Sequence, residues 1–309
     1  MSAAPEHIRS VRDYRNLLLR GCCMGAADIV PGVSGGTMAF ILGIYEELID
    51  SIRTFGTAQF LGAVAHLRLR QAFAMINVKF LLAVGAGIVL AVLTLSHALE
   101  YALEQYPIVV WSFFFGLVLA SVHVVSRRVR SWNVLLGTAT AIGLLGAYAL
   151  VGLVPVETPD APWFLVLCGA VAICAMILPG ISGSFLLVLL GKYEFILRAV
   201  NERDIVSVGY VGVGAVVGIV AFSQVLSWLL HKHHDITVAF LTGLMIGSLR
   251  KIWPWKISAG VSGEHNVLPH MFVQGHINTD LFSGIALLLI GFMVVIILEH
   301  LASRGEEGK

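Results

Sequence analysis

The sequence predicts an all-α polytopic membrane protein with two inverted repeats, each made of a broken or re-entrant helix pair and three transmembrane helices. Three observations predict this fold: an apolar composition, five long apolar runs and an internal repeat. Hydrophobic types make up 58% of the 309 residues and charged types 13%, whereas soluble domains carry about 25% charged residues. A chain this apolar needs lipid as part of its solvent. The composition therefore excludes a cytosolic enzyme, a nucleic-acid-binding protein and a disordered adaptor.

Five apolar runs are long enough to cross a hydrocarbon core of about 30 Å as helices. They are Phe80–Leu99, Pro107–Ser126, Trp132–Val154, Ile205–Leu230 and Leu281–Glu299. A shorter run, Ile236–Leu249, needs its flanks to complete a crossing. The longest polar stretch, Trp253–Asp280, is predicted to be a loop, as is the segment near Arg53–Lys79. No stretch is long and polar enough for a soluble domain, so residues 1–309 are predicted to form a single transmembrane domain.

Two further apolar regions, Leu17–Ile49 and Trp163–Val200, are interrupted by proline, glycine and serine. The interruptions are Asp28–Gly36 (DIVPGVSGG) and Pro179–Ser184 (PGISGS). Proline and closely spaced glycines stop a helix, and lipid tolerates the freed backbone groups only where protein or a water-filled cavity receives them. Each region is therefore predicted to be two half-helices that meet at a break.

The two broken regions belong to an internal repeat. Asp28–Asp50 aligns with Met176–Arg198, 148 positions further along the chain, and nine of these 23 pairs are identical. A second block, Val84–Ser121, aligns with Val211–Ser248, 127 positions further along. Each block keeps its own constant offset along its whole length. The chain is therefore predicted to be a duplication of one broken region plus three spans.

Parity sets the orientation of the two copies, which cover about residues 14–154 and 162–302. A re-entrant hairpin crosses the membrane zero times and two crossing halves cross it twice, so each repeat crosses an odd number of times. The second copy is then upside down relative to the first. With the N-terminus inside, the inner loops hold 14 of the 20 Lys and Arg residues, as the positive-inside rule requires. Both termini are therefore predicted to be cytoplasmic.

Inverted repeats with discontinuous helices are typical of secondary transporters. The second half-helix of each broken region begins at a Ser-Gly pair, where backbone N–H groups lack helical partners and the helix dipole is positive. Such an end binds an anion, and glycine lets the ligand approach closely. Two facing ends could hold one phosphate, sulfate or carboxylate. The candidate residues are Ser34, Gly35, Gly36, Thr37, Ser182, Gly183 and Ser184. The alternative is that the serines cap their own helices and the glycines serve packing.

Three acidic residues are candidates for ion coupling or gating. Asp28 lies deep in the first region, opposite Met176 in the repeat, and acids at such depth are usually functional. It could exchange a proton or bind a cation such as sodium; the alternative is a cap for local backbone. Glu46, on the same predicted half-helix as Ser34, and its repeat mate Glu194 are either gates or interfacial anchors.

Neither the cysteines nor the histidine-rich segment is predicted to form a metal or redox site. The cysteines form no CxxC pair and are expected to be packing residues. His231–Asp235 lacks the helical spacing of a catalytic zinc site and is predicted to be a solvated loop. Neither a cofactor nor a nucleic-acid partner is expected.

The two motifs, Gly25–Glu46 and Met176–Glu194, resemble the bacterial polyprenyl-phosphate transporter family, formerly a domain of unknown function. The resemblance covers the chain from about Tyr14 onward. It implies a flippase that returns undecaprenyl phosphate, the carrier lipid of envelope polymers, from the outer to the inner leaflet of the cytoplasmic membrane. It also implies that the phosphate binds at the paired helix ends named above while the prenyl chain stays in lipid between the repeats.

Two other functions compete with this one. An ion-coupled secondary transporter of a small soluble anion would use the same helix ends. A lipid-phosphate enzyme would need an arginine with histidines as nucleophile and acid, and no such cluster lies near either break in the sequence. An enzyme is therefore not expected, and the coupling ion and the oligomeric state are left open.

Overall fold

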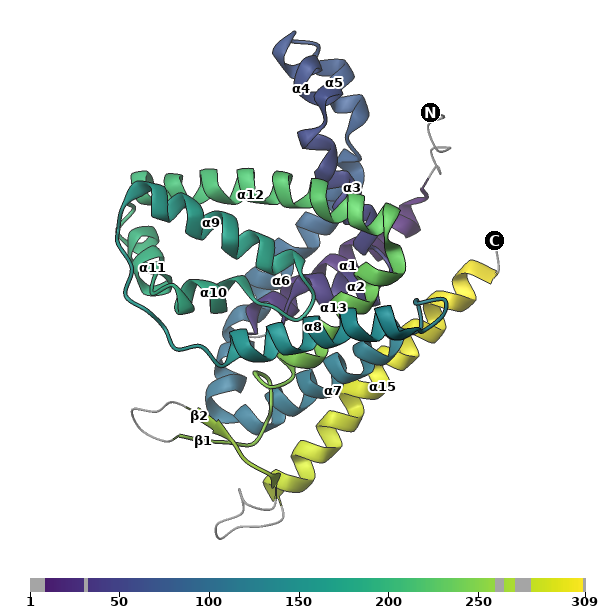
Figure 1. The fold of residues 1–309 in the computed structure, drawn as a ribbon, viewed down its shortest axis with the longest axis vertical. Coiled ribbons are helices and arrows are strands. Elements are labelled where there is room, and N and C mark those ends of the chain that lie inside the picture. The colour runs from purple at the N-terminus through teal and green to yellow at the C-terminus, as the bar shows by residue number, and fades with distance from the viewer. Residues whose placement is uncertain (1–8, 31–32, 259–263, 270–278, 308–309) are drawn as a thin grey trace.

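Helices make up nearly all of the structure, a computed structural model that describes residues 9–30, 33–258, 264–269 and 279–307 (Figure 1). The first half contains α1 (Val11–Ile29), α2 (Gly35–Ile41), α3 (Tyr45–Arg53), a 3-10 turn (Thr54–Gly56), α4 (Ala58–Ala65), α5 (Leu69–Met75), α6 (Val78–Gln105), α7 (Pro107–Ser126) and α8 (Val134–Val151). The second half contains α9 (Pro162–Ile177), α10 (Gly183–Leu189), α11 (Tyr193–Asn201), α12 (Ile205–Lys232), α13 (His234–Ser248), β1 (Lys256–Ser258), β2 (Glu264–Asn266) and α15 (Thr279–Glu307). The predicted all-α architecture is confirmed.

Five helices are long and apolar enough to cross a membrane, and they match the five predicted runs. They are α6, α7, α8, α12 and the Leu281–His300 part of α15. The shorter predicted run corresponds to α13, which has 15 residues. Large apolar side chains such as Leu93, Leu145 and Val216 are 64–75% exposed on these helices. Such exposure is what a lipid-facing surface requires.

The two predicted loops contain regular structure. The segment after α3 folds into α4 and α5, which project from one end of the molecule (Figure 1). The stretch predicted as a loop over Trp253–Asp280 contains an antiparallel hairpin in which β1 pairs with β2. Residues 259–263 and 270–278 of that stretch lie outside the described residues.

Each broken region forms three helices where the sequence predicts two. After the break, α2 and α10 have only seven residues each, and a second interruption follows. Gly43 and Gly191 lie there with φ of +71° and +64°, a conformation in which glycine carries no steric penalty and which commonly ends a helix. Glu46 is therefore not on the same helix as Ser34, and that expectation is wrong.

Helix boundaries follow the duplication. Both α2 and α3 begin and end 148 positions before α10 and α11, and α6 begins and ends 127 positions before α12. These are the two offsets found in the sequence. The repeat is therefore a repeat of helices as well as of residues.

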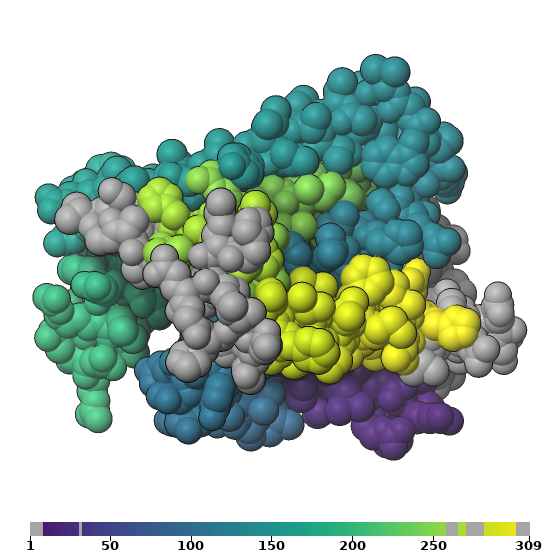
Figure 2. All heavy atoms as spheres, turned by 90° about the horizontal axis from the view of Figure 1, so that it is seen from below, coloured from purple at the N-terminus to yellow at the C-terminus, as the bar shows by residue number. Residues whose placement is uncertain are grey.

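Four helix pairs meet at glycines, where two backbones approach closely. They are α1 with α6, α9 with α12, α7 with α15 and α8 with α13. Figure 2 shows the yellow α15 lying along α7. A β-carbon at the facing glycine would overlap a backbone carbonyl oxygen of the partner helix at Gly21, Gly87, Gly169, Gly214, Gly116, Gly291, Gly143 and Gly243. Small residues at such crossings are typical of helix packing in lipid. The last two pairs each join one repeat to the other.

Two glycines of α6 provide a direct test of this packing. A methyl group at Gly87 would overlap the Leu18 carbonyl oxygen, whereas nothing lies within 4 Å of the position it would take at Gly85. We expect Gly87→Ala to lower the free energy of unfolding by about 1–3 kcal/mol, the usual cost of overpacking. Gly85→Ala should leave it unchanged or raise it slightly, because alanine favours a helix. The measurement is the thermal midpoint of the detergent-solubilised protein. Equal midpoints for the two variants would contradict close packing of α1 on α6.

Candidate functional site

The first break is closed by side chains that cap α2. The Gly35 N–H donates to Asp28 Oδ1 at 2.6 Å, and the Gly36 N–H donates to Ser34 Oγ at 3.0 Å. A carboxylate and a hydroxyl thus receive two of the donors that a helix start leaves without partners. All seven residues of α2 are buried. The capping alternative for Asp28 and Ser34 is therefore present in the structure.

Hydrogen bonds also join the first break to the second. The Ser34 hydroxyl lies within donating distance of the Met176 carbonyl oxygen, at 2.8 Å, and of the Leu178 carbonyl oxygen, at 3.1 Å. The Gly180 N–H donates to Thr37 Oγ1 at 3.0 Å. These bonds place the positive end of α2 against the last carbonyl groups of α9, which carry negative partial charge.

Tyr45 makes a third link of this kind. Its hydroxyl donates to the Ile177 carbonyl oxygen at 3.2 Å, and its side chain is only 1% exposed. No role for Tyr45 was predicted from the sequence, although its presence in both repeats was a signal. A buried phenol hydroxyl needs a hydrogen-bond partner. Here the partner is a backbone carbonyl group at the end of α9, in the other repeat.

The second break is built from equivalent residues, and Ser182 is likewise buried, at 5% exposed, but the helix that follows it is less enclosed than α2. The Ser182 side chain accepts no hydrogen bond from the backbone at the start of α10, and its hydroxyl instead lies 2.7 Å from the Ser184 hydroxyl. Of the seven residues of α10, Gly183 alone is buried. Tyr193, the repeat mate of Tyr45, is 42% exposed. The two helix starts are therefore chemically different: the α2 start holds a carboxylate, and the α10 start holds two hydroxyls that bond to each other.

The predicted phosphate-binding residues fall into two groups. Ser34, Gly35, Gly36 and Thr37 lie around the α2 start, and Ser182, Gly183 and Ser184 lie around the α10 start. Among the described residues, no side-chain hydrogen bond joins one group to the other. The nearest link is the one from Thr37 to the backbone of Gly180.

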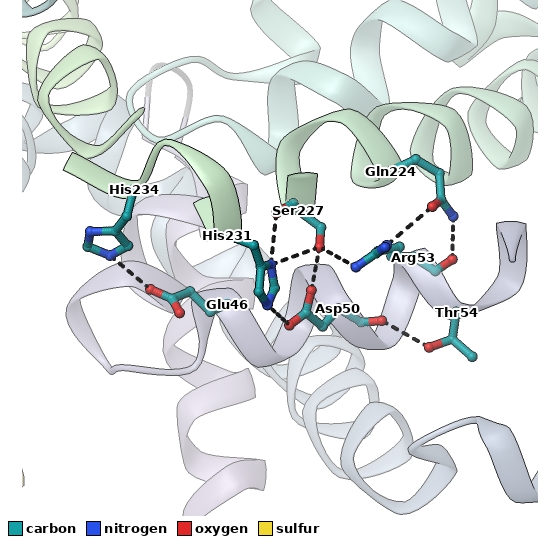
Figure 3. Close-up of polar contacts among 8 residues, drawn as sticks. All are labelled: Glu46, Asp50, Arg53, Thr54, Gln224, Ser227, His231 and His234. Atoms are coloured by element: carbon teal, nitrogen blue, oxygen red, sulfur yellow. Dashed lines mark hydrogen bonds and ion pairs between the residues drawn. The ribbon is translucent and has the colours of Figure 1, made fainter. Parts of the chain in front are cut away.

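A polar seam joins α3 to the end of α12 and the start of α13 (Figure 3). We call it the α3–α12 seam, and its side chains are Glu46, Asp50, Arg53, Gln224, Ser227, His231 and His234. Ser227 Oγ donates to Asp50 Oδ1 at 2.6 Å, and His231 Nε2 lies 3.6 Å from Asp50 Oδ2. Arg53 donates to Ser227 Oγ at 3.1 Å and to Gln224 Oε1 at 3.3 Å. The seam therefore ties repeat one to repeat two.

Glu46 belongs to this seam, whereas Glu194 does not. His234 Nε2 lies 3.4 Å from Glu46 Oε1, while Glu194 is exposed. The histidine cluster is not the predicted loop, because α12 runs to Lys232 and α13 begins at His234. In the part of the chain that the structure describes, no three His, Cys, Asp or Glu side chains are grouped to hold a metal ion.

Two basic residues hold the short helices in place. Arg128 Nη2 donates to the Phe40 carbonyl oxygen near the end of α2, at 3.0 Å. Lys192, just before α11, is 3% exposed, and its Nζ donates to Asp160 Oδ1 and to the Thr158 carbonyl oxygen. The sequence did mark Lys192 as unusual, because the equivalent residue in the other repeat is the apolar Ile44.

Comparisons with known proteins agree on one family. The family described as VCA0040-like, undecaprenyl phosphate translocase-like, matches residues 24–266. A protein of Vibrio cholerae serotype O1 named polyprenyl-phosphate transporter is 43% identical over 244 residues, which cover 79% of each chain. A protein of Staphylococcus aureus with the same name is 27% identical over 310 aligned positions, which cover 94% of this chain and 97% of the relative.

No solved structure matches the chain at a significant level. The family match spans both breaks, α2, α10 and the α3–α12 seam. Together with the 43% identity to the Vibrio cholerae protein, it places the chain: this protein belongs to the VCA0040-like family of undecaprenyl phosphate translocase-like membrane proteins.

Proposed function

We propose that the protein is a flippase that carries undecaprenyl phosphate from the outer to the inner leaflet of the bacterial cytoplasmic membrane, for reuse as a carrier lipid. The observation that carries this proposal is the family match, since both relatives are named polyprenyl-phosphate transporters. The five apolar helices and the two breaks supply what such a ligand needs. Its prenyl tail requires lipid, and its phosphate requires donors inside the membrane.

We further propose that the two repeats are inverted and that each broken region is re-entrant. The matched helix boundaries support the duplication, and the seven-residue length of α2 and α10 supports a return to the starting side. Seven helical residues rise only about 10 Å, too short to complete a crossing. An odd number of crossings per repeat then follows, with both termini in the cytoplasm.

The phosphate is proposed to bind first at the α10 start, where no side chain caps the backbone. The Ser182 and Ser184 hydroxyls lie 2.7 Å apart there and can both donate to one phosphate. The first N–H groups of α10 add positive partial charge. Gly183 lets this start pack closely on α9, because a β-carbon there would overlap the Ala172 carbonyl oxygen. The α2 start completes the site in the proposed cycle. Its Gly35 N–H is held by Asp28, so the carboxylate occupies the position that the phosphate would take.

This competition is the reason to propose ion coupling. A carboxylate and a phosphate repel each other at one helix start unless a proton or a cation neutralises the acid. Protonation of Asp28 or binding of sodium beside it would remove this repulsion and weaken the bond to the Gly35 N–H, so that the lipid phosphate can displace the side chain. Coupling is then expected at Asp28 alone, because its repeat mate is Met176.

The direct test is transport in proteoliposomes. Purified protein should move a radiolabelled prenyl phosphate between leaflets, and a prenyl alcohol without the phosphate should not be moved. Uptake of inorganic phosphate into the lumen, with no effect on the lipid, would overturn the proposal in favour of a transporter of soluble anions.

The proposed topology is checked by single-cysteine labelling. In a background without native cysteines, Glu157→Cys should react with an impermeant maleimide added to intact cells. Arg130→Cys should react only after the membrane is permeabilised, because its loop lies on the inner side of the proposed fold. Both side chains are exposed in the structure, so accessibility depends on the side of the membrane alone. The reverse labelling pattern would refute the orientation.

Asp28→Asn separates coupling from capping. Asparagine keeps an oxygen that can accept from the Gly35 N–H, so the cap and the fold should survive. It carries no charge, so transport should lose its dependence on pH or on sodium. The measurement is the initial transport rate across a pH series, with and without sodium. A variant whose ion dependence equals that of the wild type would identify Asp28 as a structural cap.

The two serines should differ when replaced by alanine. Ser34 caps α2 and bonds to the other repeat, so Ser34→Ala should lower the free energy of unfolding by about 0.5–2 kcal/mol. Ser182 caps no backbone, so Ser182→Ala should leave stability unchanged and weaken binding of a short-chain prenyl phosphate. Thr138→Ala, at an exposed position on α8, is the control. Wild-type binding by Ser182→Ala and by Gly183→Val together would exclude the α10 start as the site.

A further inference from the structure

The contacts that the broken regions make with the other repeat are found in one direction only. Repeat one inserts α2 and Tyr45 against the end of α9, and it docks α3 on α12. The duplication gives each of these residues a counterpart in the other repeat. An equivalent set of contacts is therefore possible in which repeat two inserts its broken region against repeat one. Tyr193 would then donate to the Ile29 carbonyl oxygen, and α11 would dock on the end of α6.

The exchanged contacts are not made in this structure. Tyr193 is 42% exposed where Tyr45 is 1% exposed. Among the described helices, α3 packs against α12, whereas α11 has no comparable contact with α6. Figure 2 shows the green residues of the α11–α12 corner and the blue end of α6 as separate lobes on that face. One side of the molecule is therefore interlocked and the equivalent side is open.

The residues on the open side are complementary to one another. The repeat offsets give the equivalent of each seam residue: 148 positions after α3 and 127 positions before α12. Asp50 corresponds to Arg198, Ser227 to Glu100 and His231 to Glu104. The acid of α3 thus has a basic counterpart on α11, and its two partners on α12 have acidic counterparts on α6.

The α6 acids are arranged to receive the α11 base. Glu100 and Glu104 are four residues apart, so they lie on the same face of α6. Arg198, Glu100 and Glu104 are all exposed, and none of them takes part in an ion pair with another described residue. An arginine can bind two carboxylates at once through its planar set of donors.

We propose that α11 docks on the end of α6 in a second state, in which Arg198 binds Glu100 and Glu104 and the α3–α12 seam is open. The inference rests on the proposed function, because a transporter must expose its site to the two sides in turn. On the proposed orientation, the described state is closed toward the cytoplasm and open toward the outer leaflet. The two seams are alternative gates of one cycle.

Crosslinking tests the second state directly. In the background without native cysteines, with a protease site inserted at Arg130, the pair Arg198→Cys and Glu100→Cys should be joined by a short bis-thiosulfonate reagent in membranes. The pair Asp50→Cys and Ser227→Cys, whose side chains touch in this structure, should also be joined. Crosslinking either pair should stop transport, and reduction should restore it. Arg203→Cys with Glu100→Cys is the matched control and should not react.

Charge exchange supplies a test that does not depend on cysteines. Arg198→Glu should slow transport by about fivefold, because it places like charges across the second seam. Adding Glu100→Arg and Glu104→Arg to that variant should recover most of the rate. Arg203→Glu, which changes an equally exposed arginine two residues beyond α11, should have no effect.

The outcomes separate this inference from the proposed function. If the wild type transports the lipid but the Arg198→Cys and Glu100→Cys pair never crosslinks and Arg198→Glu is fully active, the second seam is refuted and the flippase proposal stands. If both pairs crosslink but no prenyl phosphate is moved, the alternating gates stand and the proposed substrate is wrong.

Discussion

The structure depends on one constraint: backbone groups that a broken helix frees inside an apolar protein must find partners within the chain. Repeat one meets this constraint by turning the start of α2 onto the last carbonyl groups of α9. Ser34 and Tyr45 donate to those carbonyls, and Thr37 accepts from the backbone of Gly180. These bonds hold α2 in the interior and bring α3 to the surface of α12. The position of the α3–α12 seam thus follows from how the first break is satisfied.

The spans could be predicted from the sequence because a membrane helix needs only length and apolarity. The breaks could also be predicted, since proline and clustered glycines leave few alternatives. The separate helix α3 was missed because Gly43 stands alone in an apolar run, and a lone glycine is tolerated inside a helix. The second repeat did contain a signal for this interruption, because Gly191 lies at the position equivalent to Gly43.

The seam could not be predicted, because its partners come from distant parts of the chain. Asp50 and Ser227 are separated by 177 positions, and no local pattern states which helices will meet. The polar character of His231–Asp235 favoured a solvated loop, whereas these residues end one helix and begin the next. The candidate anion residues were found at helix starts as expected, but their hydrogen-bond partners depend on packing between the repeats.

The duplication dictates which helices form but not which contacts they make. At one pair of equivalent positions, Asp28 supplies a cap for α2 and Met176 cannot supply one for α10. Methionine has no donor or strong acceptor, and this one is 37% exposed. A single divergence between the repeats is thus enough to give two helix starts with different chemistry in one molecule.

The glycine crossings between α7 and α15 and between α8 and α13 have a consequence for how such a chain could arise. Each crossing joins a helix of repeat one to a helix of repeat two, at Gly116 with Gly291 and at Gly143 with Gly243. A protein consisting of one repeat would present both glycine faces without a partner. A second copy would complete them, inserted in the opposite direction under the proposed orientation. If the proposed orientation holds, the ancestor was a dual-topology homodimer whose two halves were later fused into one polypeptide.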